Sequence, residues 1–225
     1  MWFGRLIHIS IFCRSLFHMP KDLGIDFSDA KQDRAKKTLE DLLQAAYEIV
    51  EDADPAAFTS RSLAGKAGYS LGTLSKRLGS VENVFFWAIQ QGRKNKFLEL
   101  ANSFSKFDPK LSVEDFVKIM VDQSFASIGQ VSPKVMRYYD DRYTRKNGLP
   151  ADFFSYIDVM IDPYLEVCQR DQTNTFRIIS QDEARLIFKA ILTFVERPFA
   201  NGDPIMGTPE HRRIAVEVIT RMLAK

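Results

Sequence analysis

Apolar residues recur along most of the chain at spacings of three and four, the period of an α-helix with one buried face. The clearest case is the segment 36–52, in which Leu39, Leu42 and Leu43 belong to one apolar stripe. Pro55 follows, and proline and its preceding residue both disfavour helical continuation. No convincing run of alternating apolar and polar residues occurs anywhere. The pattern therefore predicts an all-α fold.

Capping residues and helix breakers divide the rest of the chain into further helices. Ser112, with Asp115 three residues later, predicts a capping box at a helix start. Pro163 is expected to kink or divide the helix that begins near residue 151, after a turn at 147–150. The predicted helices span residues 59–67, 70–78, 81 to about 104, 112 onward, 133 to about 143, 151 onward, 181–199 and 210–224.

The segment 58–80 is basic, although the whole chain has a formal net charge of only +2. Any binding to nucleic acid must therefore depend on a local patch. Two short helical patterns in the segment are separated by Gly68, which can adopt the left-handed conformation after a helix. This layout is typical of a helix-turn-helix, whose second helix enters the DNA major groove. The segment has no acidic residue, and its basic residues are Arg61, Lys66, Lys76 and Arg77.

Four short motifs surround this turn: Phe58-Thr59, Leu63-Ala64, Ala67-Gly68-Tyr69-Ser70 and Gly72-Thr73-Leu74. Over about residues 36–90 they resemble the DNA-binding head of the tetracycline-repressor (TetR) family. The resemblance implies a three-helix helix-turn-helix head followed by a larger helical domain for effector binding and dimerisation. On this basis residues 31–80 are expected to form the head and residues 81–225 the larger domain. Residues 1–30 are expected to form a flexible extension, and the alternative is an extra helix that packs on the head.

The same resemblance implies a ligand-responsive transcriptional regulator located in the cytoplasm, with no enzyme activity and no cofactor. Its implied partners are a palindromic double-stranded DNA operator, a second copy of the chain and a small, largely apolar effector that releases a repressor. The chain departs from the family pattern at Ser75, Leu78 and Val81, where an aromatic residue, a phenylalanine and a lysine are usual. The alternative is an all-helical binding or adaptor protein that has lost sequence-specific DNA binding.

Residue types in the head suggest distinct contacts to DNA. Hydroxyl groups at helix starts suit phosphate oxygens, and small side chains allow close approach to base edges. Arg77 can neutralise a phosphate or read a guanine, and Leu71 can contact a thymine methyl group. The alternative for the two cations at the end of the second helix is a solvated helix end. The predicted DNA-binding residues are Thr59, Arg61, Ser70, Leu71, Gly72, Thr73, Ser75, Lys76 and Arg77.

One motif points elsewhere. The five residues from Gly68 to Gly72 match G-x-S-x-G, the nucleophile elbow of α/β-hydrolases, and His211 follows in the order of a catalytic triad. That elbow requires a buried strand before the serine, whereas the residues before Ser70 are polar and have a helical period. The sequence thus argues against a serine hydrolase.

The cysteine and histidine residues do not indicate a redox or metal site. Cys13 and Cys168 are far apart and match no ligand spacing, which suggests a reduced, cytosolic chain. The three histidines form no metal-binding motif. The apolar segment 1–19 is too short and interrupted to span a bilayer, and no small-residue cleavage site follows it. No membrane or metal partner is expected.

Two apolar groups follow the head. The first is rich in aromatic and methionine residues, which fit either a core or an apolar effector pocket. The resemblance implies the pocket, for which the candidates are Phe116, Met120, Gln123, Tyr139, Phe153, Tyr156, Met160 and Tyr164. The second group lies on the last two helices, which pair into a four-helix dimer interface in the family. Its candidates are Phe188, Ile191, Val195, Ile214, Val218 and Met222.

Overall fold

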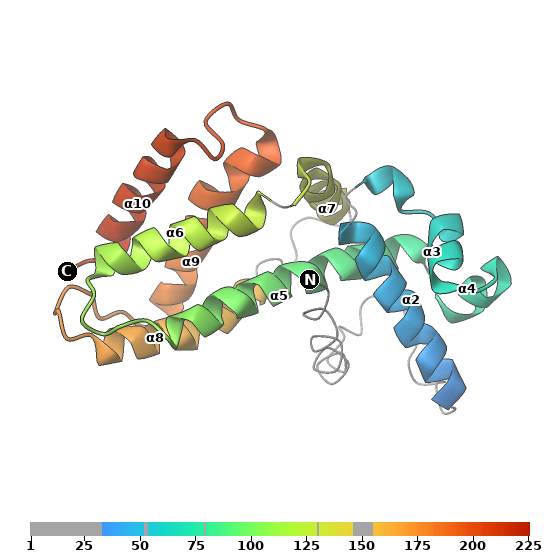
Figure 1. Cartoon of the computed structure of the whole chain (residues 1–225), viewed down its shortest axis with the longest axis horizontal. Coiled ribbons are helices and arrows are strands. Elements are labelled where there is room, and N and C mark those ends of the chain that lie inside the picture. Colours follow the sequence, from blue (N-terminus) through green and yellow to red (C-terminus); the bar gives the residue numbers. More distant parts are fainter. Residues whose placement is uncertain (1–32, 52–53, 79, 130, 146–154) are drawn as a thin grey trace, which may run out of the picture.

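A computed structural model describes residues 33–51, 54–78, 80–129, 131–145 and 155–225 (Figure 1). Within these ranges the regular structure is helical, apart from one isolated antiparallel bridge between Phe176 and Ala224. The prediction of an all-α fold is confirmed. The predicted extension over residues 1–30, the turn at 147–150 and the pocket candidate Phe153 lie outside the described residues.

The head is a cluster of short helices at one end of the molecule (Figure 1). Its elements are α2 (Asp33–Glu51), η2 (Pro55–Ala57), α3 (Ser60–Ala67), α4 (Leu71–Arg77) and the beginning of α5 (Val81–Phe104). Leu42, Leu63, Leu74 and Phe85 meet in its core and are almost fully buried. Because Phe85 comes from α5, the packing of the head continues past residue 80 into the first turns of that helix.

Polar side chains begin the short helices of the head as their sequence predicts. The Thr59 hydroxyl oxygen accepts a hydrogen bond from the backbone N–H of Ser62 at 3.2 Å, and the Ser70 hydroxyl oxygen accepts one from Thr73 at 3.2 Å. These bonds satisfy backbone donors that have no partner within the helix. The capping box predicted for Ser112 is also present at the start of α6.

Gly68 makes the turn between α3 and α4 in the left-handed conformation, with φ of 75°. Replacing it with alanine should lower the free energy of unfolding by about 1 kcal/mol, because an L side chain is strained in this region. The strain is the whole expected effect, since nothing lies within 4 Å of the added Cβ atom. Urea unfolding followed by circular dichroism measures the change.

Gly65→Ala is the matched control for this prediction. Gly65 lies inside α3, and its added Cβ atom would also meet nothing within 4 Å. Alanine has a higher helix propensity than glycine, so this variant should be more stable by about 0.5–1 kcal/mol. If both substitutions changed the free energy of unfolding in the same direction, the left-handed conformation assigned to Gly68 would be contradicted.

The remaining helices form a larger body, into which α5 runs from the head (Figure 1). They are α6 (Val113–Ile128), α7 (Pro133–Arg145), η3 (Ser155–Met160), α8 (Ile161–Arg170), α9 (Gln181–Asn201) and α10 (Pro209–Leu223). Aromatic rings from three of these helices pack together in the core: Tyr164 lies 5.8 Å from Phe116 and 5.2 Å from Phe188 between ring centroids. All three side chains are buried.

The predicted break near Pro163 is present, but it falls before the proline. The 3-10 turn η3 ends at Met160, and α8 begins at Ile161. Pro163 therefore lies in the first turn of α8, where a backbone N–H has no partner within the helix. Proline is tolerated at this place and does not interrupt the helix.

Helix α7 lies between the head and the rest of the body. Tyr138 packs edge-on against Phe58, and Tyr139 stacks on Phe86 with ring centroids 4.8 Å apart. On its other side, Asp140 accepts two hydrogen bonds from the Arg197 guanidinium of α9, the shorter at 2.6 Å. Helix α7 thus connects the head to α9.

Candidate nucleic-acid interface and ligand cavity

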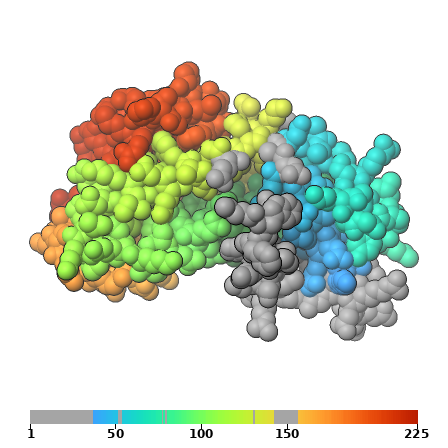
Figure 2. Space-filling view, viewed as in Figure 1, coloured from blue at the N-terminus to red at the C-terminus, as the bar shows by residue number. Residues whose placement is uncertain are grey.

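Helix α4 presents one face to the head and the other to solvent. Leu74 and the following Leu78 are 2% and 4% exposed and hold the helix against the head core. Leu71 is 50% exposed although it is apolar. Figure 2 shows the corresponding surface at the end of the molecule, where α3 and α4 protrude. An exposed leucine on a protruding helix is available for contact with a partner.

The structure leaves most of the predicted DNA-binding residues on this surface. Thr73 is half-buried, and the side chain of Arg77 lies outside the described part of the chain. The exposed members are Thr59, Arg61, Ser70, Leu71, Gly72, Ser75 and Lys76. Leu74 and Leu78 are buried and lie four positions apart. The helical period therefore places them on the opposite side of α4 from the exposed residues.

The hydroxyl groups of this surface have a structural role that the sequence did not assign to them. Besides capping their helices, Thr59 pairs with the Ser62 hydroxyl at 2.9 Å and Ser70 pairs with the Thr73 hydroxyl at 3.0 Å. Each pair uses one of its two hydroxyl protons internally. One proton per pair is left to donate to another acceptor, such as a phosphate oxygen.

The basic character of the head is partly neutralised by a neighbouring helix. Lys66 forms an ion pair with Glu48 of α2 at 3.2 Å. Among the described residues, no ion pair involves Arg61 or Lys76. Tyr69 in the turn donates a hydrogen bond to Asp41 of α2 at 2.7 Å, which fixes the turn against that helix. Two uncompensated cations of the head, Arg61 and Lys76, therefore lie at the start of α3 and on α4.

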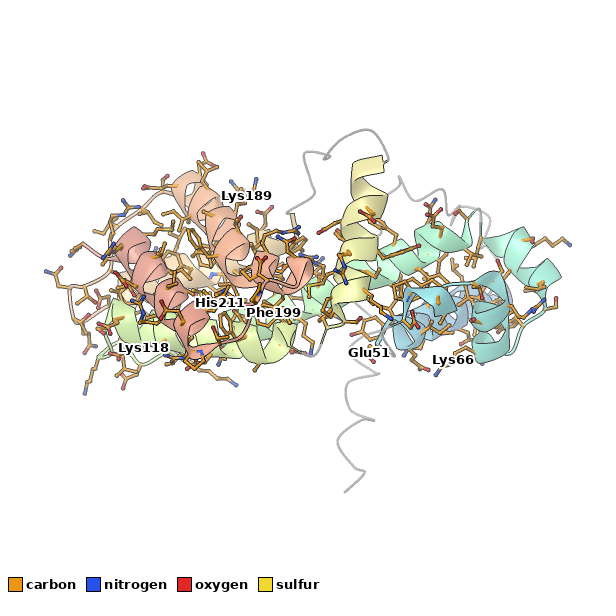
Figure 3. All side chains as sticks on the ribbon, turned by 90° about the horizontal axis from the view of Figure 1, so that it is seen from above. Glu51, Lys66, Lys118, Lys189, Phe199 and His211 are labelled. Carbon is orange, nitrogen blue, oxygen red and sulfur yellow. The ribbon has the colours of Figure 1, made fainter. Side chains whose placement is uncertain are left out.

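The hydrolase interpretation is not supported by the geometry. Ser70 follows α3 and the left-handed turn at Gly68, not a strand, so the elbow is absent there. His211 lies in the opposite half of the molecule from Lys66, which is on α3 (Figure 3). Its ring accepts from the backbone N–H of Gly207 and lies 2.7 Å from the carbonyl oxygen of Phe194. Both ring nitrogens are thus engaged, one with the loop before α10 and the other with α9.

A cavity of about 670 Å³ lies in the body beside the head. Helices α5, α6 and α9 form most of its wall, while the end of α2 and the start of α7 contribute residues on the side of the head. A cavity of this size matches those that hold small molecules in other proteins. Because α2 and α5 are also part of the head core, an occupant would touch elements of both parts.

The sequence identified this cavity only in part. Of the candidates for the effector pocket, Met120, Gln123 and Met160 line this cavity. The other described candidates are not among its lining residues: Phe116, Tyr156 and Tyr164 pack into the core of the body, and Tyr139 of α7 stacks on Phe86 of α5. Three residues predicted for the dimer interface line the cavity instead: Phe188, Ile191 and Val195.

A buried ion pair on the cavity wall was missed entirely. The Nη2 atom of Arg93 in α5 lies 2.6 and 2.7 Å from the two carboxylate oxygens of Glu196 in α9. The same atom donates to the Tyr156 hydroxyl at 2.5 Å. Burial alone would lower the pKa of the Arg93 guanidinium, but the Glu196 carboxylate together with Tyr156 and Tyr139 outweighs burial and raises that pKa above its ordinary value.

The sequence did contain a signal for this pair. Arg93 is four residues from both Ile89 and Phe97, so it lies on the apolar stripe of α5. Glu196 lies four residues after Leu192 and continues the apolar stripe of α9 in the same way. One cation and one anion at apolar positions of two helices indicate a buried pair, since a charge inside the core requires a partner.

The predicted dimer interface needs correction on α9. Phe188, Ile191 and Val195 are buried within a single copy of the chain, so their side chains are not available to a second copy. The outward face of α9 carries Leu186 and Phe194, which are 67% and 38% exposed. The candidates on α10 are Ile214, Val218 and Met222, and each is half-buried.

None of the described helices is long and apolar enough to cross a membrane. Within the same part of the chain, no group of three or more histidine, cysteine or carboxylate side chains is placed to hold a metal ion.

No protein-family model and no curated protein matches the chain. Solved structures do. A protein from Mesorhizobium loti MAFF303099, assigned to the TetR-family transcriptional regulators, superposes with a TM-score of 0.61 at 14% identity, over 86% of this chain and 100% of the other. A TetR-family transcription regulator from Marinobacter aquaeolei VT8 superposes with a TM-score of 0.51 at 18% identity, over 85% of this chain and 98% of the other.

A TetR transcriptional regulator from Rhodococcus sp. RHA1 gives a TM-score of 0.54 at 13% identity, over 84% of this chain and 97% of the other. The similarity thus extends over the head and the body together, and not over the helix-turn-helix alone. At these identities it establishes the fold. The chain has the fold of TetR-family transcriptional regulators.

Proposed function

We propose that the chain is a DNA-binding transcriptional regulator that acts as a homodimer and responds to a small molecule in the cavity. The surface of α4 carries the proposal: Leu74 anchors the helix, while Leu71, Gly72, Ser75 and Lys76 are exposed. The similar structures from Marinobacter aquaeolei and Rhodococcus are described as transcription regulators, which supports the same role here.

In this proposal α4 enters the major groove of DNA. Its exposed small residues allow the backbone to approach base edges, and Leu71 contacts a thymine methyl group. Lys76, Arg77 and Arg61 neutralise phosphates, and the free hydroxyl protons of the Thr59 and Ser70 pairs donate to phosphate oxygens. Residues 31–80 with the first turns of α5 form the DNA-binding unit, and the rest of residues 81–225 binds the effector and the second copy.

The location of the cavity supports control by a ligand. Its wall includes α5, which enters the head core, and the end of α2, which belongs to the head. A ligand that favours a dimer with poorly spaced heads must weaken DNA binding, and DNA must weaken ligand binding by the same factor. We therefore propose a repressor that its effector releases.

Selection of genomic DNA fragments by the purified chain tests the function directly. We expect enrichment of a palindromic site whose two halves lie about one helical turn apart, as two copies of α4 require. Binding should weaken as salt is raised, since phosphate contacts release counterions. Recovery of fragments without a shared motif would contradict the proposal and favour a helical binding protein that does not read DNA.

Dimer formation depends in this proposal on the outward face of α9. The double variant Leu186→Lys, Phe194→Lys places two like charges on that face in each copy. We expect the dimer dissociation constant to rise by about 100-fold or more, because charges buried without partners in an interface are strongly unfavourable. Light scattering coupled to size-exclusion chromatography over a range of concentrations measures it.

Leu111→Lys is the matched control, because Leu111 has the same 38% exposure as Phe194 but lies in the loop before α6. It should leave the dimer intact. A dimer that survives the double variant on α9 would place the interface elsewhere.

A further inference from the structure

The cavity wall has an apolar and a polar side. The apolar side comes from α9, through Phe188, Ile191, Leu192 and Val195. The polar side is formed by α5 and α6, and its uncharged polar side chains are Ser103, Gln123, Ser124 and Ser127. An occupant that fits both sides is an amphipathic molecule.

The buried ion pair of this wall is not available to a ligand. Arg93 Nη2 is committed to Glu196 and Tyr156, and the side chains of Arg93 and Glu196 are only 14% and 8% exposed. The Arg93 guanidinium also lies over the Tyr156 ring, 4.6 Å from its centroid. The two charges neutralise each other, and a ligand that took either partner would leave the other buried without a counter-ion.

The accessible charges of the cavity are negative in sum. Besides the buried pair, the charged residues of its described lining are Glu51, Lys96 and Glu99. Lys96 lies 3.7 Å from Glu99, and their side chains are 41% and 63% exposed. In the part of the chain that the structure describes, no ion pair involves Glu51. One carboxylate of the lining is therefore left without a cation.

Glu51 lies where a ligand can reach it. It is the last residue of α2, at the end of the head that is nearer to the body (Figure 3). It is exposed and also lines the cavity, in contrast to the buried Arg93. A ligand can thus approach its carboxylate without breaking an existing ion pair.

The phenol of Tyr47 reports the sign of the electrostatic field at this place. Tyr47 lies one turn before Glu51 on α2 and also lines the cavity. Burial is the main reason that its pKa is raised to about 12, and the charges of Glu51 and Glu99 add to the rise. A field that opposes a negative charge on the phenol favours a positive charge beside it.

We propose that the cavity binds amphipathic cations and that the Glu51 carboxylate holds their positive group. The inference rests on the proposed use of the cavity as an effector site, and it specifies the ligand class of that site. The apolar part of the molecule lies along α9, and its positive group lies between the end of α2 and α5. An anion would be repelled by Glu51 and would have to compete with Glu99 for Lys96.

Three naphthalene probes that differ in charge test this ligand class by isothermal titration calorimetry on the full chain. They are trimethyl(2-naphthylmethyl)ammonium, N-(2-naphthylmethyl)acetamide and 2-naphthylmethanesulfonate. The ammonium should bind about tenfold or more tightly than each of the other two, because it alone is attracted by the Glu51 charge. Added salt should reduce this advantage, since an accessible pair of charges is screened.

Substitutions of Glu51 identify the residue that selects the charge. Glu51→Gln keeps the size of the side chain without its charge, so the three probes should bind within about threefold of one another. Glu51→Lys should reverse the order, with the sulfonate bound more tightly than the ammonium. The control is Glu40→Gln, which removes a carboxylate of the same helix that does not line the cavity. This control should keep the tenfold preference.

The results separate this inference from the proposed function. Equal or tighter binding of the sulfonate or the acetamide, no binding of any probe, or an unchanged preference in Glu51→Gln would each overturn the ligand class. Binding to the DNA fragments recovered by selection is measured on the same preparation. Intact DNA binding without the probe preference refutes the ligand class alone, and the probe preference without DNA binding refutes the regulator.

Discussion

Replacing Glu196 with leucine should lower the free energy of unfolding by about 3–5 kcal/mol, the largest effect that we expect from a single substitution in this chain. The variant leaves the Arg93 guanidinium buried without its counter-ion, and the side chain of Arg93 is only 14% exposed. The charge cannot be removed by deprotonation, since an arginine keeps its proton under ordinary conditions. Urea unfolding at neutral pH measures the loss.

The double variant Arg93→Met, Glu196→Leu is the decisive comparison. It removes both charges and fills the site with apolar groups of similar size, so its stability should lie within about 1–2 kcal/mol of the original chain or above it. Arg197 retains its pair with Asp140 in both variants. If the single and double variants lose the same stability, the destabilisation arises from packing and not from an unpaired charge.

The double variant Lys76→Ala, Arg77→Ala should lower affinity for the selected operator by about tenfold or more. It should also reduce the slope of log K against log salt by about 3.6, because each phosphate contact contributes about 0.9 and each of the two copies loses two contacts. Lys76 is exposed on α4, where no ion pair opposes its use against a phosphate among the described residues. Fluorescence anisotropy on a labelled operator over a range of salt concentrations measures both quantities.

Lys118→Ala is the control for charge removal. Lys118 is on α6, in the opposite half of the molecule from Lys66 of α3 (Figure 3). Its pair with Glu114 is a surface i,i+4 contact that contributes little to stability. This control should keep the affinity for the operator and the slope of log K against log salt unchanged. An unchanged slope in the Lys76 and Arg77 variant would show that α4 does not meet the phosphate backbone.

The head was the most predictable part of the fold, because its signals are local. Ser70 as a cap and Gly68 as a left-handed turn act within a few residues of their own positions. The periods that bury Leu63 and Leu74 are equally local. A capping bond or a left-handed residue depends little on distant parts of the chain, so sequence alone specified the helix-turn-helix.

The cavity and the interface were harder to predict, because both depend on which helix lies opposite. The apolar residues of α9 cover more than one face, and periodicity does not say which face meets the core and which meets another copy. Phe188, Ile191 and Val195 were named as candidates for the dimer interface, and the structure places their side chains inside a single copy. The pairing of Arg93 with Glu196 likewise spans 103 positions of sequence.

The neighbouring residues Glu196 and Arg197 have a mechanical consequence. Successive residues of a helix point about 100° apart, and here one holds α5 through Arg93 while the other holds α7 through Asp140. Both of these helices contact the head. The first turns of α5 lie in its core, and Tyr138 of α7 packs against Phe58. Because both joints start from one turn of α9, we expect a displacement of that turn to act on the head at two places at once.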